Sequence, residues 1–356
     1  MKPFKFAKNR VWRAYKGGAL IDEMQGVDSP EDGCFPEEWV ASCVKAANRS
    51  CPGGDGISIA ETEAGGLPFD KLLESRPKEL LGPEHYNKYG ANTGFLSKIL
   101  DSAIRLPLQA HPDNVASESI YGSRFGKTEA WIVLGTREID GEKPYLIVGF
   151  NEKLNKDVFI REAMTGEMPE SLKMVHKHDV EKGDVMIIRG GTIHAIGPGM
   201  LIYEIMEPTD FVTQPERYCG EQMLTDNDRF GIADPAEAME HVFHYTPKSC
   251  ENAWNDTVIL PKVLYLDRNV KVTELINRNQ YKYFGACKID LNGTWPVRFE
   301  DKTFYSGTVT NGELEIVLED SKLKLAKGES FFMPYDAPLS EFRGNAGIIL
   351  TMPPII

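Results

Sequence analysis

Four side chains in this sequence could together bind a metal ion. Gln109 and His111 lie in "LPLQAHPD", Glu129 in "GKTEAW" and His194 in "EKGDVMIIRGGTIHAIGPG". In an extended chain, residues i and i+2 leave the same face, so Gln109 and His111 are expected to point the same way. Two imidazoles, a carboxylate and an amide oxygen suit a divalent first-row metal and leave coordination positions open for water or substrate. The competing interpretation of each histidine alone is a hydrogen-bonded structural residue.

Short apolar runs predict the strands that must position these residues. Runs such as "TEAWIVLG", "PYLIVGF", "GDVMIIRG" and "MLIYEIM" are rich in branched or aromatic residues and end in turn signals. A second set follows later in the chain, namely "KVTELIN", "TFYSGTV", "GELEIVL", "ESFFMPY" and "AGIILTM". Because short turns rather than helices join these runs, we expect antiparallel sandwiches or barrels.

Helical spacing interrupts the β pattern in two places. In residues 69–101, "FDKLLESRPKELLG" and "GFLSKILD" repeat leucine and isoleucine at helical intervals, which predicts a small helical segment. "DPAEAMEHVFHY" predicts a helix capped by Asp234, with Pro235 at its first position. We expect this helix to close a first domain over residues 1–250, with a second β domain over residues 251–356.

Composition limits the class of protein and of partner. The 356 residues carry a formal net charge of −13 and 42% hydrophobic residues, which is ordinary for a soluble globular chain. The acidic balance argues against nucleic acid or a membrane as partner, but not against a small anionic ligand in a local basic pocket. The six cysteines form no Cys-x-x-Cys pair, and no signal peptide or membrane span is evident, so a cytoplasmic location is expected. The oligomeric state is left open.

Several motifs in order resemble one enzyme family. The spacing from Gly183 to His194 follows the second motif of the cupin superfamily, although Arg189 stands where that motif usually has proline. "LPLQAHPD", "GKTEAW" and "GGTIHAIGPGMLIYEI" then resemble the type I mannose-6-phosphate isomerases, whose N-terminal signatures are similar to "RVWRAYKGGAL" and "PEEWVAS". "GFLSKILDSAIRLPLQ" resembles the family's helix leading into the metal strand, and the likeness covers roughly Arg10 to Asp210.

The resemblance implies a fold, a metal and a reaction. The fold would be mainly β, with two cupin-like (jelly-roll) domains and a small helical insert, the second domain binding no metal. One Zn²⁺ per chain would be held by Gln109, His111, Glu129 and His194, with another divalent first-row metal left open. The family interconverts an aldose phosphate and a ketose phosphate, here mannose 6-phosphate and fructose 6-phosphate, so the partner would be a small-molecule sugar or sugar phosphate.

Three further residues are catalytic candidates. Lys127 matches the active-site lysine of the family, and its alternation with Glu129 places both on one strand face. A lysine there could orient a sugar hydroxyl or stabilise negative charge. Glu204 and Lys127 are both candidates for the general base. Arg217 is the candidate for the cation that the family uses near the phosphate.

Two departures from the family pattern weaken the expected substrate. Pro107 stands where the family has a serine that helps to hold the phosphate, and Gln214 where it has an arginine. Arg217 could replace that arginine if the loop is rebuilt, and Arg189 is another nearby cation. Alternatives are therefore an isomerase of another or unphosphorylated sugar, or an inactive sugar-binding homologue. A non-heme iron oxygenase is a further alternative, against which Gln109 argues by occupying a position that oxygen would need.

Overall fold

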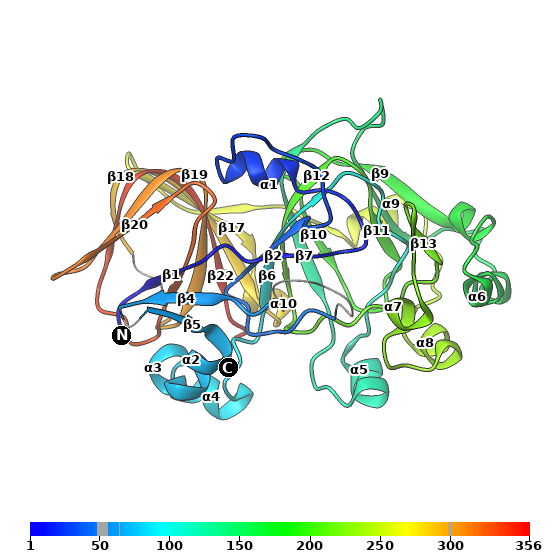
Figure 1. The fold of residues 1–356 in the computed structure, drawn as a ribbon, viewed down its shortest axis with the longest axis horizontal. Coiled ribbons are helices and arrows are strands. Elements are labelled where there is room, and N and C mark those ends of the chain that lie inside the picture. The colour runs from blue at the N-terminus through cyan, green and yellow to red at the C-terminus, as the bar shows by residue number, and fades with distance from the viewer. Residues whose placement is uncertain (48–55, 64, 298, 300) are drawn as a thin grey trace.

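The computed structural model describes residues 1–47, 56–63, 65–297, 299 and 301–356. Its architecture is mainly antiparallel β, which confirms the predicted fold class (Figure 1). The largest sheet contains, in spatial order, β16 (Lys262–Leu266), β17 (Val270–Ile276), β18 (Gly285–Pro296), β22 (Glu341–Met352), β19 (Tyr305–Val317), β21 (Ser330–Met333), β1 (Phe4–Phe6), β4 (Ile59–Thr62) and β5 (Gly65–Pro68), with β20 (Lys322–Ala326) paired to β19.

Two sheets of the other β system face each other. The larger contains β15 (Val258–Ile259), β10 (Val185–Ile188), β7 (Glu129–Thr136), β12 (Met200–Met206), β6 (Leu96–Ser102), β3 (Glu37–Val40) and β2 (Arg10–Val11). The smaller contains β11 (His194–Ile196), β8 (Tyr145–Phe150) and β9 (Val175–Asp179). Trp131, Met186 and Ile202 of the larger sheet share one buried core with Leu146 and Ile196 of the smaller. Each such buried side chain contributes roughly 1.5–3 kcal/mol, so this shared core holds the two sheets face to face.

Helices and a short ribbon complete the fold. They are α1 (Ala19–Met24), α2 (Phe69–Ser75), α3 (Pro77–Leu81), α4 (Pro83–Tyr89), α5 (Asn114–Tyr121), α6 (Lys156–Thr165), η1 (Ser171–Met174), α7 (Asp226–Phe230), α8 (Pro235–His241), α9 (Cys250–Asn255) and α10 (Arg278–Tyr281), with a ribbon of β13 (Tyr218–Cys219) and β14 (Gln222–Met223). In Figure 1, α2, α3 and α4 lie together beside β5, and α6, α7 and α8 lie at the opposite end of the molecule. The Asp234 side chain caps α8 and Pro235 opens it, as predicted. No helix in the described ranges is long and apolar enough to cross a membrane.

The predicted helical segment at residues 69–101 is correct in its first part and wrong in its last. Helices α2 to α4 occupy Phe69–Tyr89, but Leu96–Ser102 is the strand β6. All seven residues of β6 are buried, because the strand pairs with β12 on one side and β3 on the other. Leu96, Ile99 and Leu100 have helical spacing, but the two neighbouring strands in the sheet make this segment a strand.

Sheet pairing crosses the predicted boundary at residue 250 in both directions. The first strand, β1, pairs with β21, and the Phe4 ring stacks on Phe332 with ring centroids 5.6 Å apart. In the opposite direction, β15 pairs with β10 of the other sheet. The N-terminal segment is therefore part of the sheet that the C-terminal segment builds, and the boundary itself stays a prediction.

Candidate metal centre and active-site cavity

Backbone hydrogen bonds bring three distant segments together around one point. Gln109 and His194 form an antiparallel bridge whose two N–H···O bonds are 2.9 Å each. The Gly191 N–H donates to the His111 carbonyl at 2.7 Å, and the Lys127 N–H donates to the Pro112 carbonyl at 2.9 Å. The segment before α5 is thus fixed between the loop that leads into β11 and the residues just before β7.

Two glycines allow this close approach. A Cβ atom on Gly190 would lie 2.6 Å from the Cα of Asp113, and one on Gly126 would lie 2.8 Å from the Pro112 carbonyl oxygen. Neither contact is possible for a side chain, so both positions need glycine. The Gly190-Gly191 turn of the sequence therefore has a packing reason beyond ending a strand.

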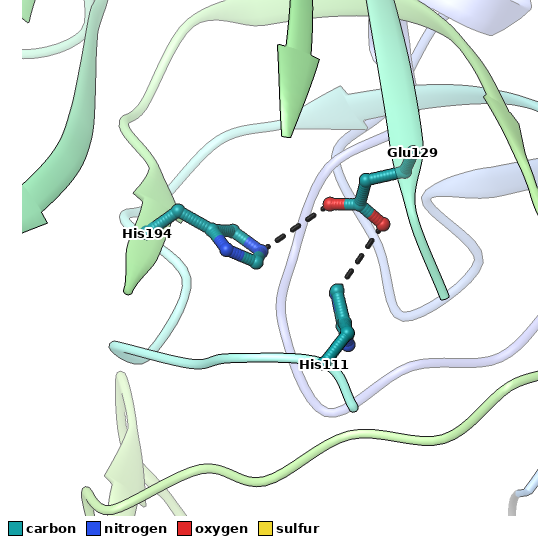
Figure 2. Close-up of side chains that lie close together, drawn as sticks. All are labelled: His111, Glu129 and His194. Carbon is teal, nitrogen blue, oxygen red and sulfur yellow. Dashed lines mark ion pairs between the residues drawn. The ribbon is translucent and has the colours of Figure 1, made fainter. Parts of the chain in front are cut away.

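His111, Glu129 and His194 converge in the interior. The Glu129 carboxylate lies between the two imidazoles, with its Oε2 atom 3.2 Å from His111 Nε2 and its Oε1 atom 3.3 Å from His194 Nε2 (Figure 2). The ligand atoms of the three residues all lie within 4.8 Å of one another, and all three side chains are buried. This is the spacing that a single cation requires.

The hydrogen bonds of the imidazoles fit a metal site. His111 Nδ1 lies 2.8 Å from the Phe211 carbonyl oxygen and His194 Nδ1 lies 2.9 Å from that of Thr192, so each Nδ1–H donates to backbone. Both Nε2 lone pairs then face Glu129, and the buried Nε2 of His194 has no hydrogen-bond partner among the described residues. Such an orphaned lone pair is costly unless a cation or a donor takes it. These three residues therefore fit a divalent metal.

The electrostatics of the cluster keep its ligands in the forms that bind a metal. Burial, together with the neighbouring Lys127 ammonium, lowers the pKa of His111 to about 4, so this imidazole is neutral at physiological pH. Burial alone would raise the pKa of Glu129, but Lys127 and His111 lower it well below its usual range. A neutral imidazole and an ionised carboxylate are the required ligand forms.

Gln109 and Lys127 lie in the same cavity as the cluster. Both line a cavity of about 300 Å³, as do His111 and Glu129. The predicted shared face of Gln109 and His111 agrees with this placement. Lys127 is buried, and its Nζ atom lies 2.8 Å from His111 Nε2 and 3.1 Å from Glu129 Oε2. The structure thus brings all four predicted ligands and the predicted lysine to one site.

Glu204, the other candidate base, forms part of the cavity wall. Its Oε1 atom accepts a hydrogen bond of 2.9 Å from Trp131 Nε1, and its Oε2 atom lies 3.7 Å from Lys98 Nζ. Burial and the negative charge of Glu129 raise the pKa of Glu204 to about 7. A carboxyl with this pKa exchanges a proton readily at neutral pH.

Sequence reasoning missed a buried charged cluster on the cavity wall. Arg13 Nε lies 2.9 Å from Glu37 Oε1, and Arg13 Nη2 lies 3.1 Å from Asp210 Oδ1. Lys98 Nζ lies 3.6 Å from Glu37 and 3.4 Å from Asp210. Although burial opposes it, Arg13 and Lys98 lower the pKa of Glu37 to about 2, so the carboxylate stays ionised. One signal was present in the sequence: Lys98 stands between the apolar residues of "GFLSKILD", a segment that we predicted to be helical.

The predicted substitute arginines do not reach the cavity. Arg217 Nε donates to the Thr165 carbonyl at 2.9 Å, and the exposed Arg189 donates to the Asp256 carbonyl at 2.8 Å. The backbone N–H of Arg217 also donates to the Gly166 carbonyl at 2.9 Å, which keeps this residue beside the end of α6. Neither arginine lines the cavity, whereas the two residues that depart from the family pattern, Pro107 and Gln214, both do.

The structure therefore combines a mainly antiparallel β fold with a buried His–Glu–His cluster that is a candidate metal centre. Comparison with protein families matches residues 276–353 to the cupin domain of mannose-6-phosphate isomerase. Among curated proteins, the mannose-6-phosphate isomerase of Streptococcus mutans is 28% identical over 345 residues, covering 97% of this chain and 96% of that protein. ManA, a mannose-6-phosphate isomerase of Bacillus subtilis, is 26% identical over 279 residues, covering 76% and 80%.

Solved structures agree with these sequence matches. The crystal structure of the mannose 6-phosphate isomerase from Bacillus subtilis superposes with a TM-score of 0.75 at 19% identity, covering 99% of both chains. A mutant of phosphomannose isomerase from Salmonella typhimurium superposes with a TM-score of 0.73 at 15% identity, covering 100% of both chains. In sequence and in fold the chain is therefore similar to mannose-6-phosphate isomerases, and its residues 276–353 match the cupin domain of that family.

Proposed function

We propose that the protein is a metal-dependent aldose–ketose isomerase that interconverts mannose 6-phosphate and fructose 6-phosphate. One observation carries the proposal: a buried cluster of His111, Glu129 and His194 opens into the same cavity as Lys127 and Glu204. A Lewis-acid site beside a lysine and a carboxyl of near-neutral pKa suits the transfer of a proton between neighbouring carbons. The names of the relatives indicate which sugar phosphate to test first.

His111, Glu129 and His194, with Gln109 as the fourth ligand, would hold the metal, and zinc is the first candidate. When bound, such a cation supplies Lewis-acid stabilisation of negative charge on the sugar oxygens next to the reacting carbons. The backbone acceptors of the two Nδ1–H groups fix both rings, so the ligands keep their orientation without the substrate.

Glu204 is our candidate for the proton carrier. In the forward reaction its carboxylate would take the proton from C2 of the aldose and return a proton to C1, while the hydroxyl proton of O2 passes to O1, giving the ketose. The Trp131 N–H holds one carboxylate oxygen in place, and the second oxygen lies on the side of Lys98. The Nζ atom of the buried Lys127 lies 3.1 Å from Glu129 Oε2, next to the proposed metal position. Its ammonium group would therefore stabilise the oxyanion that develops between the two proton transfers.

A second candidate substrate is an unphosphorylated sugar. Pro107 and Gln214 line the cavity and offer no charge to a phosphate. The cations that line it among the described residues, Arg13, Lys98 and Lys127, are each already paired with a carboxylate. A dianionic phosphate would have to compete with those pairs, whereas a sugar hydroxyl would not.

Metal analysis and turnover measurements test the proposal. The purified protein, loaded with zinc and in parallel with iron, cobalt or manganese, is assayed with mannose 6-phosphate and with mannose, and ketose formation is followed. Turnover of either sugar supports an isomerase, and the ratio of kcat/KM values decides between the two candidates. Tight sugar binding by calorimetry without turnover of either sugar would instead identify a sugar-binding homologue.

Substitution of a ligand tests the metal site itself. His194→Ala should lose both stoichiometric metal and activity, because it removes a buried nitrogen that has no hydrogen-bond partner in the described part of the chain and is free to bind the metal. His241→Ala is the matched control, since His241 is exposed on α8 and should keep both. Full metal content in the His194 variant would contradict the proposed site.

A further inference from the structure

Lys127 lies just before the strand that carries its neighbour Glu129. The strand β7 begins at Glu129, whose backbone is fixed by pairing with Ile188 of β10 and Met206 of β12. Lys127 precedes this ladder, although its side chain is buried against the metal cluster. The backbone that carries an ammonium group has to aim it at the reacting atoms. Contacts other than the sheet ladder must therefore hold this segment.

The residue Glu207 holds this segment on both sides of Lys127. Its Oε2 atom accepts a hydrogen bond of 2.9 Å from the Thr128 N–H, and its Oε1 atom accepts one of 3.2 Å from the Gly126 N–H. The backbone N–H of Glu207 also donates to the Thr128 carbonyl at 3.0 Å. Both residues that flank Lys127 are thus bonded to this one glutamate.

The Glu207 carboxylate is well suited to this task because it can only accept hydrogen bonds. The residue is 3% exposed. Besides the two backbone N–H groups, the Asn114 side-chain amide donates to its Oε1 atom at 2.8 Å, so that both carboxylate oxygens face neutral donors. A glutamine has the same size, but it would turn an N–H group toward one of these donors in either orientation of its amide. The site therefore requires a carboxylate.

We propose that Glu207 is a positioning residue, which fixes the backbone on both sides of Lys127 and so aims the Lys127 ammonium at the reacting sugar. Among the described residues Glu207 is not one that lines the cavity, so it acts through Lys127 and does not touch the substrate. The inference rests on the proposed function, in which Lys127 stabilises the developing oxyanion. A displacement of about 1 Å can cost about 10²-fold in rate, so a residue outside the cavity can control the reaction.

A double-mutant cycle with Lys127 tests this route. In the metal-loaded protein, Glu207→Gln should lower kcat by about tenfold and change KM by less than about twofold, because the ammonium acts on charge that develops during the reaction. In the Lys127→Met background the same substitution should not lower kcat further, because the group that it positions is absent. Unchanged kcat, or an equal loss with and without the lysine side chain, would overturn the proposal.

The variant Glu38→Gln is the matched control. Glu38 is also a buried carboxylate that accepts hydrogen bonds from neutral donors, the Asn9 N–H and the Gln25 side-chain amide, but it does not line the cavity. Its substitution should leave kcat unchanged. An equal loss of kcat in Glu38→Gln and Glu207→Gln would show a general cost of replacing a buried carboxylate, which would also overturn the proposal.

Lysine labelling tests the positioning role without turnover. Lys127 is 6% exposed and Lys98 is 3% exposed, so both should react slowly with acetic anhydride in the unmodified protein. Glu207→Gln should raise the labelling rate of Lys127 about tenfold relative to Lys98, because only the segment around Lys127 is released. Mass spectrometry of peptides measures this ratio, and Glu38→Gln should not raise it.

The labelling ratio separates the two ideas. If the protein converts neither sugar, the proposed function fails, and a raised ratio in Glu207→Gln still supports the positioning of Lys127. If the ratio does not change, or if both lysines react faster to the same extent, Glu207 does not position Lys127, whatever the sugar that the protein converts.

Discussion

The buried imidazole of His85 makes the stability of this protein depend on pH in a specific window. His85 lies on α4 and is only 3% exposed. Its Nε2–H donates to the Asn92 carbonyl at 2.8 Å, and its ring packs 4.8 Å from both Tyr89 and Phe304. Burial is the main cause that lowers the pKa of His85 from 6.5 to about 4. The folded state therefore holds the imidazole neutral where the unfolded state protonates it.

The sign and size of the effect follow from proton linkage. Between pH 6.5 and pH 4 the unfolded chain binds more protons at His85 than the folded chain, so the free energy of unfolding falls as the pH falls. The pKa difference converts to a loss of about 3 kcal/mol by pH 4, at about 1.4 kcal/mol per unit. Above pH 6.5 both states are neutral at this position and the contribution is zero.

The variant His85→Gln isolates this term. Glutamine keeps an amide N–H for the Asn92 carbonyl but does not titrate, so the stability gap between the two proteins should shift by about 3 kcal/mol between about pH 7.5 and pH 4. The assay is urea unfolding at fixed pH values in the presence of a chelator, so that metal binding does not contribute. His241→Gln changes an exposed position of α8, so its free energy of unfolding should depend on pH as that of the unmodified protein does. If the free energy of unfolding of His85→Gln shows the same pH dependence as that of the unmodified protein, the reasoning is refuted.

Three further predictions concern the site. Glu204→Gln should lower kcat by about 10²- to 10⁴-fold with metal content unchanged, as expected for a lost proton carrier, and unchanged kcat would exclude Glu204 from that role. Lys127→Met should retain metal and lose at least about tenfold in kcat, since the ammonium beside Glu129 is removed; steady-state kinetics with metal analysis checks this. Gln214→Arg should lower KM for mannose 6-phosphate by about tenfold and leave KM for mannose unchanged; an equal change for both sugars would contradict a phosphate contact.

Local patterns in the sequence predicted the helix α8 and eight strands, namely β7, β8, β10, β12, β17, β19, β21 and β22. Short runs of branched and aromatic residues predicted β7, β8, β10 and β12. This works because side-chain direction in a strand depends only on neighbouring residues. The same reasoning failed at β6, where Leu96, Ile99 and Leu100 have helical spacing although all seven residues of the strand are buried. It also divided β19, one strand whose register shifts between Val309 and Asn311, into two shorter runs.

The sequence by itself determined the chemistry that this protein can offer. Residue identity alone indicated the metal ligands His111, Glu129 and His194. Spacing indicated that Lys127 and Glu129 share one face of a strand. Tertiary structure alone decided which cations reach the cavity. Lys98 meets Asp210, 112 residues away, and Arg13 meets Glu37, whereas Arg217 turns to Thr165. The reason is physical: periodicity and turn chemistry act over a few residues, but the partner of a buried charge is set by which strands pair, and that pairing joins residues far apart in the chain.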